Sequence, residues 1–318
     1  MDKAIAGKSL FIAGVEALKV EGDLGRGDRF GEIFFLTNNP DVIRGLLPPF
    51  FQISAGSLEY SYLLSGKPVV YALEDYHPTD STDAIKHLSL RIAQLSYFLH
   101  LLWYTKDNSA HMEFGYLLAD LNTAALGVHR NFRGVLKTNS QGKMDPVTFS
   151  REELRQARLF FGKFKQPPCG ASPQVMVEAL GRWVRADYFV QAARSNADIG
   201  VKIANYCTAL EGLFSTDNQE LSHKLAERIA IFLAESPKRS ELYRSIKRAY
   251  AIRSKVVHGG RGGPNLLDQA MEVSGLCDDV CRDALLKIYS EPELHDQFIN
   301  GKAGTDLEEY FLKRLLGE

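Results

Sequence analysis

The pattern of hydrophobic and polar positions divides the chain into two halves of different character. In the first half, short apolar runs bounded by turn residues predict strands at 10–15, 32–36, 114–118 and 124–136. The runs 58–63 and 69–73 flank Ser65-Gly66-Lys67-Pro68, which predicts a β-hairpin. Leucine, isoleucine and aromatic residues recur at helical spacing over 81–104, which predicts one long and largely buried helix.

The second half has helical periodicity throughout. We expect helices at 174–194, 198–214, 220–234, 238–258, 267–289 and 305–316. Ser150 and Glu153 have the spacing of a capping box, and Ser172-Pro173 fits an N-cap followed by proline. The polar segment 137–143 is expected to be a loop or linker. The predicted fold is therefore an α+β domain over 1–145, followed by an all-α helical-bundle domain over 146–318.

The composition is that of a globular protein with one large or two medium domains. The 318 residues are 45% hydrophobic and 24% charged. No apolar run reaches the ~18 residues of a membrane span, and the first residues lack the apolar core of a signal peptide. Four scattered cysteines suit a reducing compartment. We expect a cytoplasmic protein that does not enter a membrane.

Several short motifs are better explained by structure than by chemistry. Gly7-Lys8-Ser9 lacks the upstream glycine of a phosphate-binding loop, and His111-Met112-Glu113 lacks the paired cysteines of a zinc deaminase. The glycines between 22 and 31 do not have dinucleotide-binding spacing and are typical of a loop between strands. Cys277 and Cys281 are four residues apart with His295 nearby, and buried structural cysteines are favoured over zinc ligands. We therefore expect neither a metal nor a cofactor.

The net charge is −1, but positive charge is concentrated near the end of one predicted helix. Between 236 and 261, Glu241 is the sole acidic residue of the sequence, and the basic residues are Lys238, Arg239, Arg244, Lys247, Arg248, Arg253, Lys255 and Arg261. Such an excess would attract a phosphate backbone. The alternative is an ordinary solvated helix face.

Arg253 and His258 stand within this basic stretch, followed by Gly259 and Gly260. Arginine can hold a phosphate through a bidentate fork, and histidine can transfer a proton near neutral pH. Five residues of ideal helix turn through about 500°, so the pair does not share one face. The glycines favour a helix end just past His258, where the chain can leave helical geometry and the helix dipole favours imidazolium.

The order of three segments resembles the HEPN superfamily, and most closely its ApeA-type bacterial defence proteins. An ALEGLF helix at 209–214 precedes an SHKLAERIA helix at 222–230, and a later helix ends in R-x4-H-G. The resemblance covers roughly residues 150–318 and not the N-terminal half. It implies a homodimer whose two motifs face each other and cleave RNA without a metal, leaving 2′,3′-cyclic phosphate and 5′-hydroxyl ends.

The resemblance also implies roles for individual residues. His258 would take or give the proton during attack by the 2′-hydroxyl, and Arg253 would hold the scissile phosphate. Ser254 stands where the family usually has a longer polar side chain, and Glu211 matches a recurrent acidic position that would orient Arg253. Basic neighbours would support RNA binding, namely Lys247, Arg248, Lys255 and Arg261.

The function expected from these features is a metal-independent endoribonuclease acting on tRNA or mRNA, in anti-phage defence or growth arrest. The N-terminal domain would be a sensor or regulator, and a partner protein would be a second means of regulation. The main alternative is a non-catalytic HEPN scaffold that binds RNA or a protein partner, as in toxin–antitoxin pairs. In that case Arg253 would merely pair with Glu211 or Glu227, and His258 would cap a helix. An activity centred in the N-terminal half lacks a cluster of acid, base and nucleophile to support it.

Overall fold

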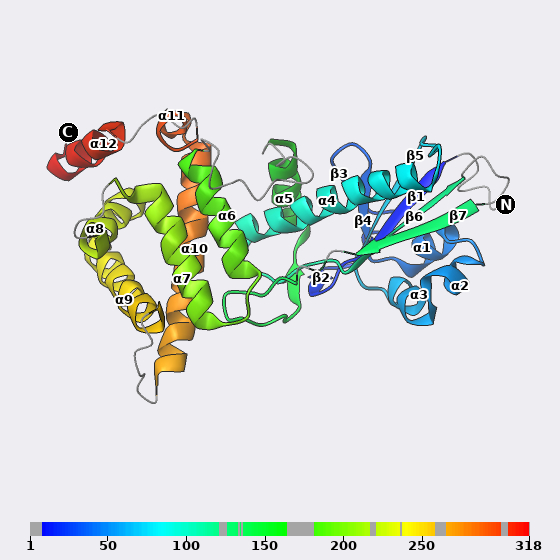
Figure 1. The fold of residues 1–318 in the computed structure, drawn as a ribbon, viewed down its shortest axis with the longest axis horizontal. Coiled ribbons are helices and arrows are strands. Elements are labelled where there is room, and N and C mark those ends of the chain that lie inside the picture. Colours follow the sequence, from blue (N-terminus) through cyan, green and yellow to red (C-terminus); the bar gives the residue numbers. More distant parts are fainter. Residues whose placement is uncertain are drawn as a thin grey trace. The chain divides into compact units, whose positions relative to one another are not determined.

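The chain forms two compact units in a computed structural model (Figure 1). The structure describes 8–120, 126–132, 134, 136–163, 181–216, 221–235, 237–257, 265–299 and 305–317. The first unit is built from 1–137 and 144–170, and the second from 138–143 and 171–318. The first is α+β and, within the described residues, the regular elements after residue 180 are all helices, as the hydrophobic pattern predicts.

An antiparallel six-stranded sheet organises the first unit, in the order β3-β4-β5-β1-β6-β7. Its strands are β1 (Ser9–Gly14), β3 (Asp28–Phe30), β4 (Phe34–Thr37), β5 (Val69–Glu74), β6 (Phe114–Asp120) and β7 (Leu126–Phe132). The central strand β1 pairs with β5 on one side and with β6 on the other. The apolar runs that predict strands at 10–15, 32–36, 114–118 and 124–136 thus correspond to β1, β4, β6 and β7.

Helices cover both faces of this sheet (Figure 1). The long helix α4 (Ser81–Thr105) lies on one face, and α1 (Pro40–Leu46), α2 (Phe51–Ala55) and α3 (Ser57–Leu63) lie on the other. Leu10 and Ile12 of β1 join the core beneath α1–α3. Gly115 of β6 meets α4 so closely that an added Cβ would stand 2.8 Å from Ile92. Burial on both faces explains why β1 is an apolar run rather than an alternating pattern.

The predicted hairpin over 58–73 is wrong, because its first arm is helix α3. Leu63 and Tyr60 are three residues apart and pack together on the core, which suits a helix and not a strand. A short apolar run fits either period, so tertiary contacts decide its conformation. The second arm is β5, as predicted, but its partners are β1 and β4, which are distant in sequence.

A second, two-stranded parallel sheet pairs β2 (Leu18–Val20) with β8 (Val147–Phe149). The glycines of the loop that follows β2 have left-handed backbone, with φ of 107° at Gly27, as a turn-rich loop requires. β8 leads into α5 (Arg151–Lys163), which packs against α4. The sequence places the division after residue 145, whereas β8 and α5 pack with the first unit.

The predicted capping box at the start of α5 is confirmed. The Ser150 backbone N–H donates to Glu153 Oε2 at 2.8 Å, and the Glu153 backbone N–H donates to Ser150 Oγ at 3.2 Å. Glu153 Oε1 also accepts a hydrogen bond at 2.6 Å from Nζ of Lys106, the residue that follows α4. The box therefore both begins α5 and ties it to α4.

Substitution of Ser150 by alanine should destabilise the protein by about 1 kcal/mol, because one helical N–H loses its acceptor. Urea unfolding followed by circular dichroism measures this change. Replacement of Ser150 by aspartate, which keeps an acceptor at the N-cap, should restore most of the loss. If alanine and aspartate were equally destabilising, hydrogen bonding at this cap would not be the cause.

The helical unit contains α6 (Arg182–Arg194), α7 (Ile199–Phe214), α8 (Leu221–Leu233), α9 (Arg239–Val257), α10 (Leu266–Ser290) and α12 (Thr305–Leu316). These helices match the predicted ones where the chain is described. The first part of the predicted helix 174–194 and the Ser172-Pro173 cap lie outside the described residues. Two short elements were not predicted, η2 (Pro292–Leu294) and α11 (His295–Phe298). Helix α7 is central, because it packs against α6, α8, α9 and α10.

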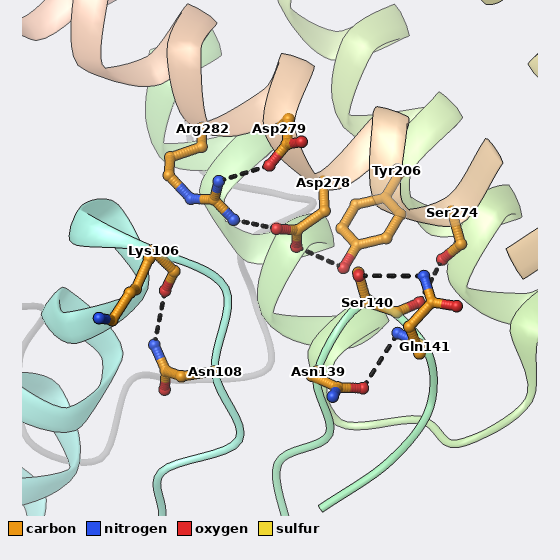
Figure 2. Close-up of polar contacts among 10 residues, drawn as sticks. All are labelled: Lys106, Asn108, Asn139, Ser140, Gln141, Tyr206, Ser274, Asp278, Asp279 and Arg282. Carbon is orange, nitrogen blue, oxygen red and sulfur yellow. Dashed lines mark hydrogen bonds and ion pairs between the residues drawn. The ribbon is translucent and has the colours of Figure 1, made fainter. Parts of the chain in front are cut away.

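The polar segment 138–143 belongs to the helical unit. Figure 2 shows the Ser274 hydroxyl of α10 reaching the backbone oxygen of Ser140, at 2.6 Å. Gln141 Nε2 donates to the backbone oxygen of Met271 at 2.9 Å, and Thr138 Oγ1 donates to that of Asn196 at 2.7 Å. The polar composition of this segment predicts a linker, but hydrogen bonds attach it to α10 and to the residues that follow α6.

A buried polar network links α7 to α10 (Figure 2). The Tyr206 hydroxyl of α7 donates to Asp278 Oδ1 at 2.7 Å, and Arg282 pairs with the other oxygen of Asp278. Arg282 also binds the exposed Asp279 at 2.7 Å. Asp278 is fully buried, so its charge is balanced inside the bundle.

Cys277 and Cys281 of α10, which are expected to be structural, are buried, and so is Cys207 of α7. The part of the chain that the structure describes holds no group of three or more histidine, cysteine or acidic residues able to bind a metal. None of its helices combines the length and the apolar character needed to cross a membrane.

Candidate functional site

The last turns of α9 bring Arg253 against Glu211 of α7. Arg253 Nη2 lies 3.6 Å from Glu211 Oε1, and the two side chains are 31% and 19% exposed. These residues are 42 positions apart in the sequence and meet because α7 and α9 pack together. The expected proximity of Glu211 and Arg253 is therefore present. Among the described residues, Glu211 rather than Glu227 is the carboxylate paired with this arginine.

The pair is held loosely. Glu211 Oε1 and Arg253 Nε are both buried, and neither has a hydrogen-bond partner within the described residues. A distance of 3.6 Å is an ionic contact and not a bidentate fork. About a third of the Arg253 side chain is open to solvent, although its Nε is buried.

Helix packing beneath the pair is largely uncharged. Tyr250, one turn before Arg253, is buried and donates its hydroxyl to the Cys207 backbone oxygen at 3.2 Å. A hydrogen bond from Cys277 and burial raise the pKa of Cys207 well above its usual range. Burial likewise raises the pKa of Tyr250. The formal charges at this place are therefore those of Glu211 and Arg253.

Burial also raises the pKa of Glu211, although the charge of Arg253 and the nearby Tyr250 hydroxyl act in the opposite direction. Glu211 thus keeps its proton to a higher pH than an exposed glutamate does. Once ionised, it attracts the guanidinium and limits the positions that the arginine adopts. A carboxylate with this property can orient Arg253 without forming a tight ion pair.

The other predicted site residues differ in their exposure and in their contacts. Ser254 and Lys255 are exposed on α9. Lys247 Nζ donates to Ser222 Oγ of α8 at 3.1 Å, and Arg248 pairs with Glu272 of α10. Arg248 is 44% exposed, so it remains accessible to a ligand despite this contact. Two of the predicted RNA-supporting residues, Lys247 and Arg248, thus also connect α9 to its neighbouring helices.

His258 and Arg261 lie outside the described residues, and α9 is described as far as Val257. The spacing between Arg253 and the imidazole therefore stays a prediction.

Two other polar residues, both on α8, contact neighbouring helices. Arg228 of α8 donates a hydrogen bond at 2.7 Å to the backbone oxygen of Phe214, the last residue of α7. His223 of α8 lies 2.7 Å from the Tyr243 hydroxyl of α9. Both contacts join neighbouring helices.

The sequence reasoning missed the contribution of Tyr250 and the network around Asp278. Tyr250 gives a weak signal, since it is one aromatic residue on a helix with several apolar positions. Asp278 and Arg282 give a clearer one, because they are an acid and a base four residues apart beside the apolar positions Cys277 and Cys281.

In comparisons with known proteins, no family model, no curated protein and no solved structure matches this chain.

Proposed function

We propose that the helical unit is a metal-independent endoribonuclease of HEPN type. The observation that carries the proposal is the placement of Arg253 near the end of a basic helix, partly exposed and adjacent to the partly buried Glu211. An arginine in this position can bind a phosphate and has a carboxylate that restrains it. The resemblance to HEPN domains supplies the histidine, His258.

The reaction needs no metal, because RNA carries its own nucleophile. One imidazole takes the proton of the 2′-hydroxyl, the 2′-oxygen bonds to phosphorus, and the bond from phosphorus to the 5′-oxygen breaks. The departing 5′-oxygen receives a proton from an imidazolium, either the same His258 or that of a second copy. Arg253 stabilises the negative charge on the phosphate during this exchange. The products are a 2′,3′-cyclic phosphate and a 5′-hydroxyl.

Residues near Arg253 would contribute to RNA binding in this proposal. Ser254 and Lys255 are exposed beside Arg253 and can contact RNA, and Arg248 can do so from the same helix. We propose that tRNA or mRNA is the substrate, which places the reaction in the cytoplasm. Two copies would join through the helical unit, and the first unit or a partner protein would regulate cleavage in defence or growth arrest.

Incubation of the full-length protein with total RNA and tRNA in EDTA tests the proposal. Cleavage should continue in EDTA and leave cyclic-phosphate ends. A substrate with 2′-deoxyribose at the cleaved position should resist, because its nucleophile is missing. Cleavage that requires a divalent metal, or that proceeds on the deoxy substrate, would contradict the mechanism.

A second candidate is a non-catalytic scaffold that binds RNA or a protein. It is favoured by the contacts of Lys247 with Ser222 and of Arg248 with Glu272, which give these residues a structural role. A scaffold would bind RNA without shortening it, and His258→Ala would leave that binding unchanged. Fluorescence anisotropy with a labelled tRNA, run beside the cleavage assay, separates the two functions.

A further inference from the structure

A pocket of about 220 Å³ lies in the first unit, between α3, the end of β1 and the start of β6. Its walls include three carboxylate residues, Glu16, Glu59 and Glu113, and three aromatic ones, Tyr62, Phe114 and Tyr116. This volume far exceeds the ~10–15 Å³ that one water molecule needs. The pocket can therefore hold a small organic molecule.

Local backbone structure directs the three carboxylates to the same place. Glu16 and His111 exchange backbone hydrogen bonds at 2.8 and 3.3 Å. Glu113 follows His111 by two residues, and Glu59 stands in the first turn of α3. Within the described residues, none of the three carboxylates forms an ion pair, and the Tyr62 hydroxyl is the side-chain group that interacts with Glu16. Three acidic groups from separate segments thus line one cavity without a salt-bridge partner among the described residues.

Tyr116 supplies an independent indication of a ligand. This residue of β6 is 2% exposed, and its ring lines the pocket. Its hydroxyl is buried and makes no hydrogen bond of normal length and angle in the described part of the chain, although Arg130 lies near it. Arg130 faces it across the strand pair and lies over the Phe114 ring, 5.5 Å from the centroid. A buried hydroxyl without a partner is costly, and a polar group in the pocket would satisfy it.

Tyr62 cannot neutralise the acidic groups. Its one hydroxyl proton is donated to the Val15 backbone oxygen at 2.9 Å. Burial, followed by the Glu16 and Glu113 carboxylates, raises the pKa of Tyr62, so the hydroxyl stays protonated. Lys67 Nζ lies 4.4 Å from the centroid of this ring, which shows that the ring can take a cation on its face.

We propose that this pocket binds a small organic cation, an ammonium or guanidinium group joined to a short apolar body. The carboxylates would accept the hydrogen bonds of the cation, the aromatic rings would contact the apolar body, and Tyr116 would bond a polar atom of the ligand. A bare metal ion is less suited, because the described residues hold no cluster with metal-binding geometry. Binding of such a ligand would be the signal through which the first unit acts as a sensor.

Isothermal titration calorimetry on the full-length protein tests the proposal, with phenethylamine and agmatine as probes and 2-phenylethanol as the neutral comparison. Both amines should bind and the alcohol should not. Glu59→Gln should weaken amine binding about tenfold, because one charge-assisted hydrogen bond is lost. Leu58 lines the pocket mouth and is 85% exposed, so Leu58→Lys should keep the fold and compete with the amine.

Glu21→Gln is the matched control, since Glu21 is exposed in the same unit and lies outside the pocket. It should leave binding unchanged. Absence of binding by both amines at millimolar concentration would overturn the proposal. Equal binding of amine and alcohol, or equal affinity in wild type and Leu58→Lys, would also overturn it. The assay contains no RNA, so its result is separate from that of the nuclease proposal.

Discussion

Substitution of Arg253 by alanine should lower metal-independent RNA cleavage by about a hundredfold or more while the fold is kept. The arginine is 31% exposed, so its removal leaves no large cavity in the bundle. Glu211 would lose its cation, but burial already raises the pKa of its carboxyl. It can therefore take up a proton instead of remaining a buried charge. Cleavage of a labelled tRNA in EDTA, under single-turnover conditions, measures the loss.

Three companion variants make this result specific. Arg253→Lys keeps the charge but loses the planar fork, and should retain more activity than alanine, within about tenfold of wild type. His258→Ala should be at least as damaging as Arg253→Ala, because the proton transfer is removed. Arg244→Ala changes an exposed arginine on the same helix and should have little effect. Equal losses in Arg244→Ala and Arg253→Ala would indicate general attraction to RNA instead of a site.

Substitution of Asp278 by alanine should destabilise the protein by about 3–5 kcal/mol. The carboxylate is fully buried between the Tyr206 hydroxyl and the Arg282 guanidinium (Figure 2). Without it, the tyrosine loses its acceptor and a nearly buried arginine loses its main counter-charge. Urea unfolding followed by circular dichroism gives the change in the free energy of unfolding.

Asp279→Ala is the control for this prediction. Asp279 binds the same arginine, but its side chain is 66% exposed, so the loss should be below about 1 kcal/mol. Asp278→Asn should fall between the two, because it keeps an acceptor for Tyr206 and loses the charge. If Asp278→Ala cost no more than Asp279→Ala, the buried network would not stabilise the bundle.

Agreement between sequence and structure is best where the hydrophobic period is long. Helix α4 and helices α7–α10 each repeat an apolar stripe over several turns, which is a local property of the sequence. The Ser150–Glu153 capping box is equally local, since both hydrogen bonds close within four residues. Such features can be read before any tertiary contact is known.

Prediction fails or stops where a segment has two acceptable local structures. Residues 58–63 are too few to distinguish a strand from a helix, and the core beneath α3 selects the helix. The segment 138–143 is polar and reads as a loop, yet its attachment to α10 depends on Met271 and Ser274, more than a hundred residues later. Its place in the helical unit could not be seen from its composition.

The amino-acid sequence was sufficient to predict the α+β first half, the helical second half and the positions of the long helices. It could do so because helix periodicity, caps and charge clusters are local. Tertiary structure alone decided that Arg253 lies 3.6 Å from Glu211, that Asp278 is balanced inside the bundle, and that three glutamates line one pocket. These arrangements join residues far apart in the chain, and the packing of hydrophobic faces brings them together.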